Sequence, residues 1–238
     1  MSAGVVLLAT GTLPPGEWLV NAANFSTVPP HAGSARPADP AEAAAPRPPE
    51  EQAPAPPVLL RSVVPEVATA DGELTVVAGE SPVRGSGPLR RYLVEVEEGL
   101  PGAAGDFAAA VDEVLADPRG WIGDGMSVQR VDSGPVDFRV ALAAPATVDD
   151  LCYPLRTEGE VSCTQGDRAI INQNRWVSGV RHFDGDLATY RVYVVNHEVG
   201  HALGHGHVTC PGAGERAPVM QQQTLGLQGC EPNGWPHP

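Results

Sequence analysis

The sequence predicts an α+β domain, with α/β-like alternation, in which helices pack against one sheet. Three observations support this fold class. Several short stretches have apolar residues in alternation, which is typical of strands. Two longer stretches are typical of helices, one by its apolar spacing and one by its histidine spacing. The order along the chain is strand, helix, several strands and helix, as in a domain built around one sheet.

Two strands and one helix are expected in the first half of the domain. Residues 73–78 read as a strand, and residues 92–97 alternate between two faces, as in a half-buried strand. A helix is expected over residues 106–116, where Asp106 can cap the first turn and residues 117–120 end the last. The apolar face of this helix consists of Phe107, Val111, Val114 and Leu115.

The second half of the domain adds strands and a long helix. Strands are expected over residues 126–131 and 136–142, and a further one within residues 168–177. A helix is expected over residues 187–203, with Asp186 as its N-cap. β-Branched residues in this stretch favour a strand instead, but the spacing of the histidines that follow favours a helix. These residues are Val192, Val194 and Val195.

The N-terminal residues have a different composition from the rest of the chain. Twelve of the 25 prolines lie in residues 1–60, so we expect a disordered Pro/Ala-rich spacer before one domain over residues 72–238. Residues 4–13 are apolar but short, and no Lys or Arg precedes them. They are interpreted as part of a secretion signal or membrane anchor, with an ordinary apolar N-terminus as the alternative. The expected boundary therefore places residues 1–71 outside the domain.

Charge excludes several classes of partner. The 238 residues carry a formal net charge of −14. An acidic chain repels phosphate backbones and anionic lipid, so we do not expect nucleic-acid binding or a polybasic membrane contact. No apolar run approaches the ~18–20 residues that are needed to span a bilayer. We expect a monomer.

A short stretch near the C-terminus has the spacing of a metal site on a helix. His197 and His201 lie about 40° apart around a helix and ~6 Å apart along it, so both imidazoles can reach one ion. Glu198 lies about 100° from His197, where its carboxylate can reach a metal-bound water but does not easily ligate the same ion. Gly204 can end the helix with a positive φ, and the turn then brings back His207 as a third ligand.

Three neutral imidazoles and one water form the open tetrahedral pattern of catalytic zinc. His205 is the competing third ligand, but a continued helix would turn it about 80° from His197, and Gly204 disfavours continuation. Two alternatives stay open, namely a zinc site kept only for stability and a His-rich helix end without metal. Glu198 argues against the first, because a structural site has no use for a base beside its ligands.

The pattern His-Glu-x-x-His-x-x-Gly-x-x-His over residues 197–207 resembles the helix and turn of the metzincin metallopeptidases. That family has a methionine in a tight turn beneath the zinc, and Met220, at the end of Ala217-Pro218-Val219-Met220, fits this second feature. Further stretches resemble a family of exported, largely actinobacterial metzincin-like proteins of unknown substrate, and the likeness covers about residues 72–238. These stretches are residues 92–97, 175–176, 190–196, 210–211 and 218–224.

The resemblance implies a zinc peptidase fold with a mixed sheet and a cleft above the active-site helix. Met220 would then lie beneath the zinc, although simple core packing also accounts for a buried methionine. No tyrosine follows Met220, so the tyrosine ligand of some metzincins is not expected. No cysteine precedes Cys152, so a zinc-capping cysteine in a pro-segment is not expected either. Asp39 or Asp71 could cap the zinc instead, on residue type alone.

The four cysteines allow three pairings, and we expect Cys152–Cys163 and Cys210–Cys230, because both close short loops. Each disulfide would stabilise the fold by about 3 kcal/mol on the chain-entropy model. Disulfides imply an oxidising compartment, which agrees with an extracytoplasmic location, either secreted or anchored at the cell envelope. Four buried free thiols in a cytosolic protein are the alternative.

The expected function is that of a zinc-dependent endopeptidase or closely related amide hydrolase. Zinc, held by His197, His201 and His207, would activate a water, and Glu198 would act as general base. The expected partner is a protein or peptide substrate. Two alternatives are an enzyme that acts on cell-wall peptide, and a cell-envelope binding or scaffolding domain that keeps zinc for stability.

Some further residues are ambiguous in sequence. Asp184-Gly185-Asp186 could contact calcium but is expected to cap the long helix. Residues 221–223 could line the substrate cleft or form a solvated turn. Tyr193 and Val194 could form the floor of the cleft or belong to the core. The tryptophans are expected to pack in the core rather than bind substrate; they include Trp121, Trp176 and Trp235.

Overall fold

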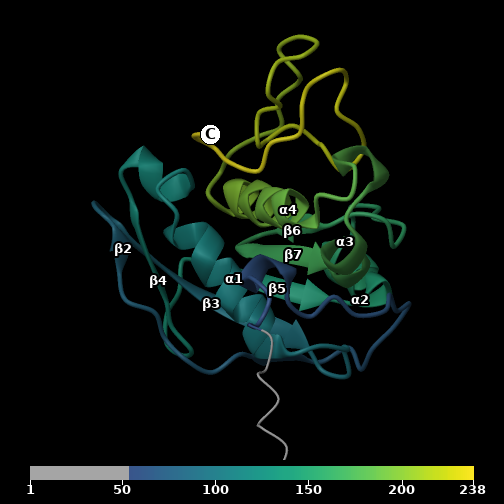
Figure 1. Ribbon diagram of the computed structural model, residues 1–238. Helices are drawn as coiled ribbons and strands as arrows, with labels where there is room; N and C mark the ends of the chain where they lie inside the picture. The colour runs from purple at the N-terminus through teal and green to yellow at the C-terminus, as the bar shows by residue number, and fades with distance from the viewer. Residues whose placement is uncertain (1–53) are drawn as a thin grey trace, which may run out of the picture. The chain divides into compact units, whose positions relative to one another are not determined.

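The computed structural model of the chain describes residues 54–238 (Figure 1). Our expectations for the apolar residues 4–13, for the Pro/Ala-rich stretch up to residue 53 and for Asp39 therefore lie outside the described residues. Within residues 54–238, no helix is both long enough and apolar enough to span a bilayer.

The sheet has seven strands and mixed directions. Its order is β2-β4-β3-β5-β7-β6, and β1 pairs with β3 outside this path. Strands β4, β3, β5 and β7 run parallel, whereas β6 is antiparallel to β7 and forms one edge of the sheet. The strands are β1 (Leu74–Val76), β2 (Arg84–Gly85), β3 (Leu89–Glu97), β4 (Ser127–Arg130), β5 (Phe138–Ala143), β6 (Cys163–Gln165) and β7 (Arg168–Asn172). The predicted mixture of helices with one mixed sheet is confirmed.

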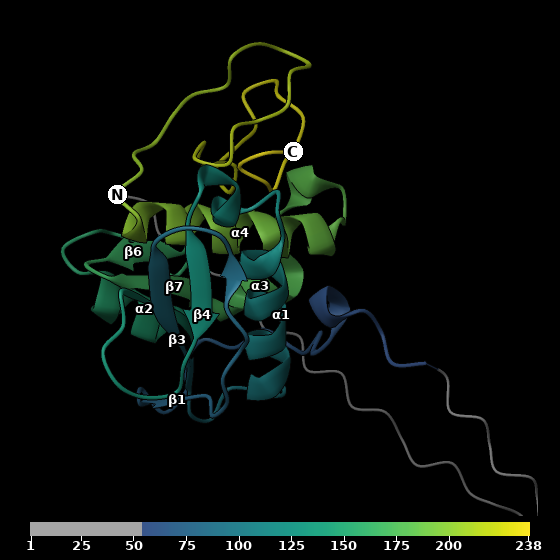
Figure 2. The ribbon, with the colours of Figure 1, turned by 90° about the vertical axis from the view of Figure 1, so that its left-hand side faces the viewer.

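Helices cover both faces of this sheet. The main core lies between the sheet and helices α1 and α4, and a smaller core lies between the other face and α2. In both ribbon views α4 lies between the sheet and the long loops of the C-terminal segment (Figure 1, Figure 2). The helices are α1 (Ala104–Ala116), α2 (Pro145–Cys152), α3 (Gln173–Ser178) and α4 (Leu187–Ala202), and short 3₁₀ turns occur at η1 (Val58–Leu60), η2 (Trp121–Asp124) and η3 (Arg181–Phe183).

Two expectations for the first half of the domain are corrected. Strand β3 is not half-buried, because it pairs with strands on either side; Tyr92 faces the main core, and on the opposite face Leu93 is buried and Glu95 is buried in ion pairs with Arg139 of β5 and Arg168 of β7. Helix α1 begins at Ala104, and Asp106 is not its cap but accepts a hydrogen bond from Ser62 Oγ at 2.7 Å. The predicted apolar face of α1 is buried as expected.

Residues 168–177, which were expected to contain one strand, contain strand β7 and most of helix α3. Strand β7 ends at Asn172, whose side chain accepts from the amides of Asn174 and Arg175 and starts α3. The sequence analysis also missed α2, although Pro145 at its first turn is a helix-start signal. The edge strand β6 was missed because three residues are too few to show alternation.

The segment before Gly72, expected to belong to the spacer, is part of the folded unit. Val58 and Leu59 pack against the main core. Arg191, fully buried in α4, donates through Nη1 to the carbonyl oxygen of Leu59 at 3.1 Å and to that of Arg61 at 2.8 Å. The folded unit therefore starts earlier than expected, because a buried cation in α4 uses this segment's carbonyls as partners.

Helix α4 confirms the predicted long helix over residues 187–203. Asp186 caps it, with the amide of Thr189 donating to its carboxylate at 2.9 Å. The residues from Tyr190 to Gly200 are all buried. A helix that is buried on every side needs no polar face, and tertiary packing outweighs the weak helix propensity of its valines.

Candidate metal centre and cleft

Three histidines from the end of α4 and the turn after it meet in space. His197 and His201 lie on the last turns of α4, and the chain turns at Gly204, whose φ is 95°. The turn returns His207, whose Nε2 lies 2.9 Å from Nε2 of His201. One nitrogen of each ring lies within 4.8 Å of the other two. The three histidines are thus grouped as the sequence predicts and could hold a metal ion.

Backbone carbonyls determine which nitrogen of two of these rings faces the centre. Nδ1 of His197 lies 2.8 Å from the carbonyl oxygen of Val219, and Nδ1 of His201 lies 2.8 Å from that of His205. Because a carbonyl only accepts, each Nδ1 carries a hydrogen, so the neutral form of each ring has its lone pair on Nε2. Metal-ligating histidines are commonly held in this way. The donor set therefore fits a metal that prefers imidazole nitrogen, such as zinc.

Burial keeps the ring of His197 in the neutral form that binds metal. It lowers the pKa of His197 to about 3. The pKa of His207 is also lowered, first by loss of hydration and then by the neighbouring His201. Burial has the opposite effect on the adjacent acid and raises the pKa of Glu198 to about 8, against a hydrogen bond from Thr164. These directions apply to the protein without a metal ion.

Thr164, which the sequence analysis did not identify, holds Glu198. Its Oγ1 lies 2.7 Å from the backbone oxygen of Glu198 and 3.0 Å from the carboxylate Oε2. A hydroxyl has one hydrogen and two lone pairs, so it can donate to an ionised carboxylate and accept from a protonated one. Thr164 lies 34 residues before Glu198, and no sequence motif connects the two residues. The contact exists because β6 lies beside α4.

His205 has a different role from the three grouped histidines. Its backbone oxygen accepts from His201, and its ring stacks on Trp121 with centroids 4.4 Å apart. The ring is thus turned to the tryptophan rather than to the metal centre. The turn at Gly204 separates the two candidates for the third position, and His207 is the one that reaches it.

Met220 lies directly against the helix at the motif. A Cβ atom added to Gly200 would lie 2.4 Å from Sδ of Met220 and 2.6 Å from the Trp121 ring. The turn that carries Met220 is closed by the amide of Gln221, which donates to the carbonyl of Pro218 at 2.9 Å. The preceding residue, Val219, supplies the carbonyl that orients His197. This turn therefore supports the metal centre by contact and by hydrogen bonding.

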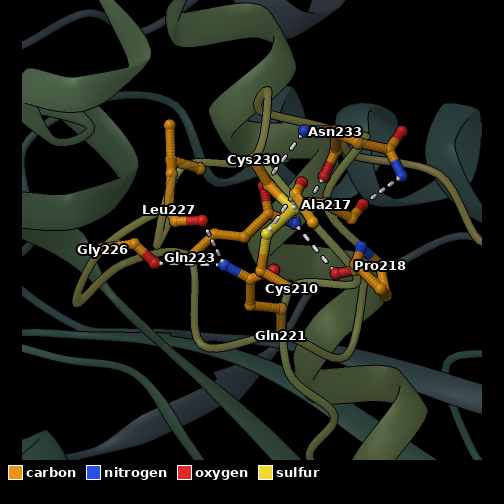
Figure 3. Close-up of a disulfide and its surroundings, with 10 residues drawn as sticks. Cys210, Ala217, Pro218, Gln221, Gln223, Gly226, Leu227, Cys230 and Asn233 are labelled. Atoms are coloured by element: carbon orange, nitrogen blue, oxygen red, sulfur yellow. Dashed lines mark hydrogen bonds between the residues drawn. A yellow bond between two sulfur atoms is a disulfide. The ribbon is translucent and has the colours of Figure 1, made fainter. Parts of the chain in front are cut away.

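Buried amides hold the C-terminal segment in place (Figure 3). Nε2 of Gln221 donates to the carbonyls of Gly226 and Leu227, at 3.3 and 2.9 Å. Gln223 and Asn233 exchange hydrogen bonds, with Nε2 of Gln223 donating to the Asn233 carbonyl at 2.8 Å. Of the three glutamines that could have lined the cleft, Gln221 and Gln223 are structural.

A cleft of about 410 Å³ opens over the histidines. Its lining includes residues 155–158 and 160–164, which lead into β6, and Gln222, Thr224 and Leu225 of the C-terminal segment. Tyr193 also lines it, with its ring centroid 5.2 Å from that of His197, whereas Val194 belongs to the core. The cleft therefore contains the three histidines, the buried acid and the outer edge of β6, with which no strand of residues 54–238 pairs.

Both expected disulfides are present. Cys152–Cys163 joins α2 to β6, one residue before Thr164, and Cys210–Cys230 ties the loop after His207 to the C-terminal segment (Figure 3). Two disulfides indicate an oxidising environment.

The remaining candidates do not form a second centre within residues 54–238. The histidine triad is the one group of three or more His, Cys, Asp or Glu side chains there that could hold a metal. Asp186 serves as a helix cap, as expected. Asp71 donates its amide to the carbonyl of Glu98 at the end of β3 and is not among the residues that line the cleft. Trp121 and Trp176 are buried in the core.

The fold and the site describe an α/β domain in which three histidines at the end of a buried helix could hold one metal ion. Residues 62–238 match the model of a family described as protein of unknown function (DUF3152), and the chain belongs to this family. No curated protein matches the chain.

Proposed function

We propose that the chain is a zinc-dependent metallopeptidase. The observation that carries the proposal is the convergence, in one cleft, of three histidines and a buried glutamate. Three imidazoles are a catalytic rather than a closed structural donor set for zinc, because they leave a fourth position open. When bound, zinc supplies a Lewis acid that polarises a carbonyl and makes a water acidic.

The chain's own residues would move the proton and position the peptide. Glu198 accepts a proton from the attacking water and returns it to the leaving amine. Thr164 keeps its carboxylate in place in both protonation states, since its hydroxyl can donate or accept. Within residues 54–238, no strand pairs with the outer edge of β6 beside the cleft, and an extended peptide can pair with such an edge.

The resemblance to the metzincins supports the same proposal. The motif over residues 197–207 and the methionine turn at Met220 are the features on which the resemblance rests, and they contact each other through Gly200. We further propose that the chain acts outside the cytoplasm, secreted or anchored at the cell envelope, since both cysteine pairs are oxidised.

The experiment compares the full chain with the Glu198→Gln variant. Metal content is measured by mass spectrometry, and cleavage is measured on a protein-derived peptide library and on purified cell-wall peptide. We expect one zinc per chain in both proteins and cleavage by the wild type alone. Equal cleavage by the two proteins would refute the role of Glu198. One zinc in each with no cleavage by either would favour a zinc-stabilised binding domain.

A further inference from the structure

Large apolar side chains are exposed around the mouth of the cleft. Tyr153 is 78% exposed, Leu225 is 68% exposed and Leu155 is 53% exposed, which makes them three of the four most exposed large apolar residues within residues 54–238. Leu155 and Leu225 line the cleft, one from the segment before β6 and the other from the C-terminal segment. Tyr153 lies two residues before Leu155, and its carbonyl accepts from Gln165 of the edge strand β6 at 2.8 Å.

The fold does not use these side chains. Neither Leu155 nor Leu225 belongs to the two core clusters or to the residues packed against them. Their loops are anchored through other groups, since the amide of Leu155 donates to the Cys152 carbonyl at 2.9 Å and that of Leu225 to the Gln222 carbonyl at 3.0 Å. Folding gains little from keeping such surfaces apolar, and grouped exposed apolar residues commonly mark a binding surface.

The charged side chains near Leu155 balance each other, so apolar contacts are the main source of attraction for a ligand at the mouth of the cleft. Arg156, Glu158 and Glu160 line the cleft in the same segment as Leu155, and Glu160 is paired with Arg175. The remaining two, Arg156 and Glu158, have opposite charges, so this segment presents no net charge to a ligand.

We propose that the cleft binds an extended peptide through large apolar side chains, which contact Leu155 and Leu225. This inference rests on the proposed function, because it names the substrate class of the same site. It favours protein segments rich in Leu, Phe, Met or Tyr over peptides of alanine and acidic residues. The bound side chains would cover the apolar surface that the folded chain leaves in water.

The test measures binding without turnover. The full-length Glu198→Gln chain, loaded with zinc, is titrated by fluorescence anisotropy into two labelled ten-residue peptides, one rich in Leu and Phe and one of Ala and Glu. The same titration is repeated with added Leu155→Ser or Leu225→Ser. Val83→Ser is the matched control, because Val83 is 51% exposed and does not line the cleft. Leu225→Gln retains side-chain length if the serine variant folds poorly.

We expect the apolar peptide to bind at least tenfold more tightly than the Ala/Glu peptide. Each leucine variant should weaken that binding by about tenfold, which corresponds to about 1.4 kcal/mol. Val83→Ser should leave it unchanged. Equal affinity for the two peptides, no binding of either, or an equal effect of all three serine variants would overturn the proposal. So would a dimer of the parent chain that Leu225→Ser converts to monomer, since the apolar rim would then bind a second copy.

The two proposals fail in distinguishable ways. If the proposed peptidase function is wrong, the wild type binds zinc but cleaves no peptide. Binding of the apolar peptide can still be observed in that case, because it is measured on the Glu198→Gln chain, which does not need to be catalytic. Loss of the apolar preference appears as unchanged binding in the leucine variants, even where the wild type cleaves peptides.

Discussion

Gly200, inside the histidine motif, lets α4 and the turn that carries Met220 approach each other closely. An added Cβ would lie 2.4 Å from Sδ of Met220 and 2.6 Å from a ring atom of Trp121. Ordinary van der Waals contact begins near 3.4 Å, so both neighbours must move by about 1 Å. Trp121 is restrained by the bond from its Nε1 to the Asn196 carbonyl at 2.9 Å. We therefore expect Met220 and its turn to move.

The magnitude follows from two opposing effects. Replacing glycine by alanine inside a helix stabilises it by roughly 1 kcal/mol. Overpacking a core costs about 1–3 kcal/mol, and two simultaneous overlaps with buried neighbours place this site at the upper end. Gly200→Ala should therefore destabilise the chain by about 2 kcal/mol. For a domain of this size, the melting temperature should fall by roughly 4–8 °C.

The variant should also weaken metal binding. Val219, next to Met220, supplies the carbonyl that orients His197, so a displaced turn misaligns a ligand. The assays are thermal unfolding of the metal-free chain and zinc affinity by competition with a chelator. Gly206→Ala is the matched control, because an added Cβ there meets nothing within 4 Å. A Gly200→Ala chain with unchanged stability and zinc affinity would refute the reasoning.

Three further predictions concern the general base, pH and the N-terminal segment. Thr164→Val should lower kcat about tenfold or more with little change in KM, whereas Thr164→Ser should retain activity; equal rates in both variants would contradict the positioning of Glu198 by the hydroxyl. In the metal-free chain the pKa of Glu198 is raised to about 8 from 4.5, so its contribution to stability is present at acid pH and is lost as pH rises from about 5 through 8. Glu198→Gln should remove that loss, as measured by unfolding free energy against pH; parallel curves for the two proteins would argue against the shift. A chain that begins at Gly72 lacks the carbonyls that bind Arg191 and the apolar contacts of η1. Its free energy of unfolding should be several kcal/mol lower than that of a chain that begins at residue 54. Equal denaturation midpoints for the two chains would show that the segment is dispensable.

The sequence alone was sufficient to predict the features that depend on residues close together along the chain. The apolar face of α1 and the spacing of His197 and His201 are set by one helical repeat, which can be counted along the chain. The same holds for Gly204, where a positive φ was expected and is found. Disulfide pairing followed from loop length, because short loops close at the lowest entropy cost.

Other features depend on residues that are distant in sequence. The burial of β3 on both faces follows from its central place in the sheet, and alternation within one strand does not reveal its neighbours. The role of the segment before Gly72 depends on Arg191, more than 100 residues later, whose burial leaves carbonyl oxygens as its partners. The assignment of Gln221 and Gln223 to structure rather than to the cleft also required knowing which carbonyls they face.

The sequence by itself determined which side chains could hold one ion, because the identity and spacing of the three histidines follow from the helix and the turn after it. Only the tertiary structure decided how those groups are held. The carbonyls of Val219 and His205 orient two of the rings, and Thr164 restrains Glu198. The physical reason is that hydrogen bonds and apolar contacts act between atoms that folding brings within a few ångströms, and such proximity is not a property of position along the chain.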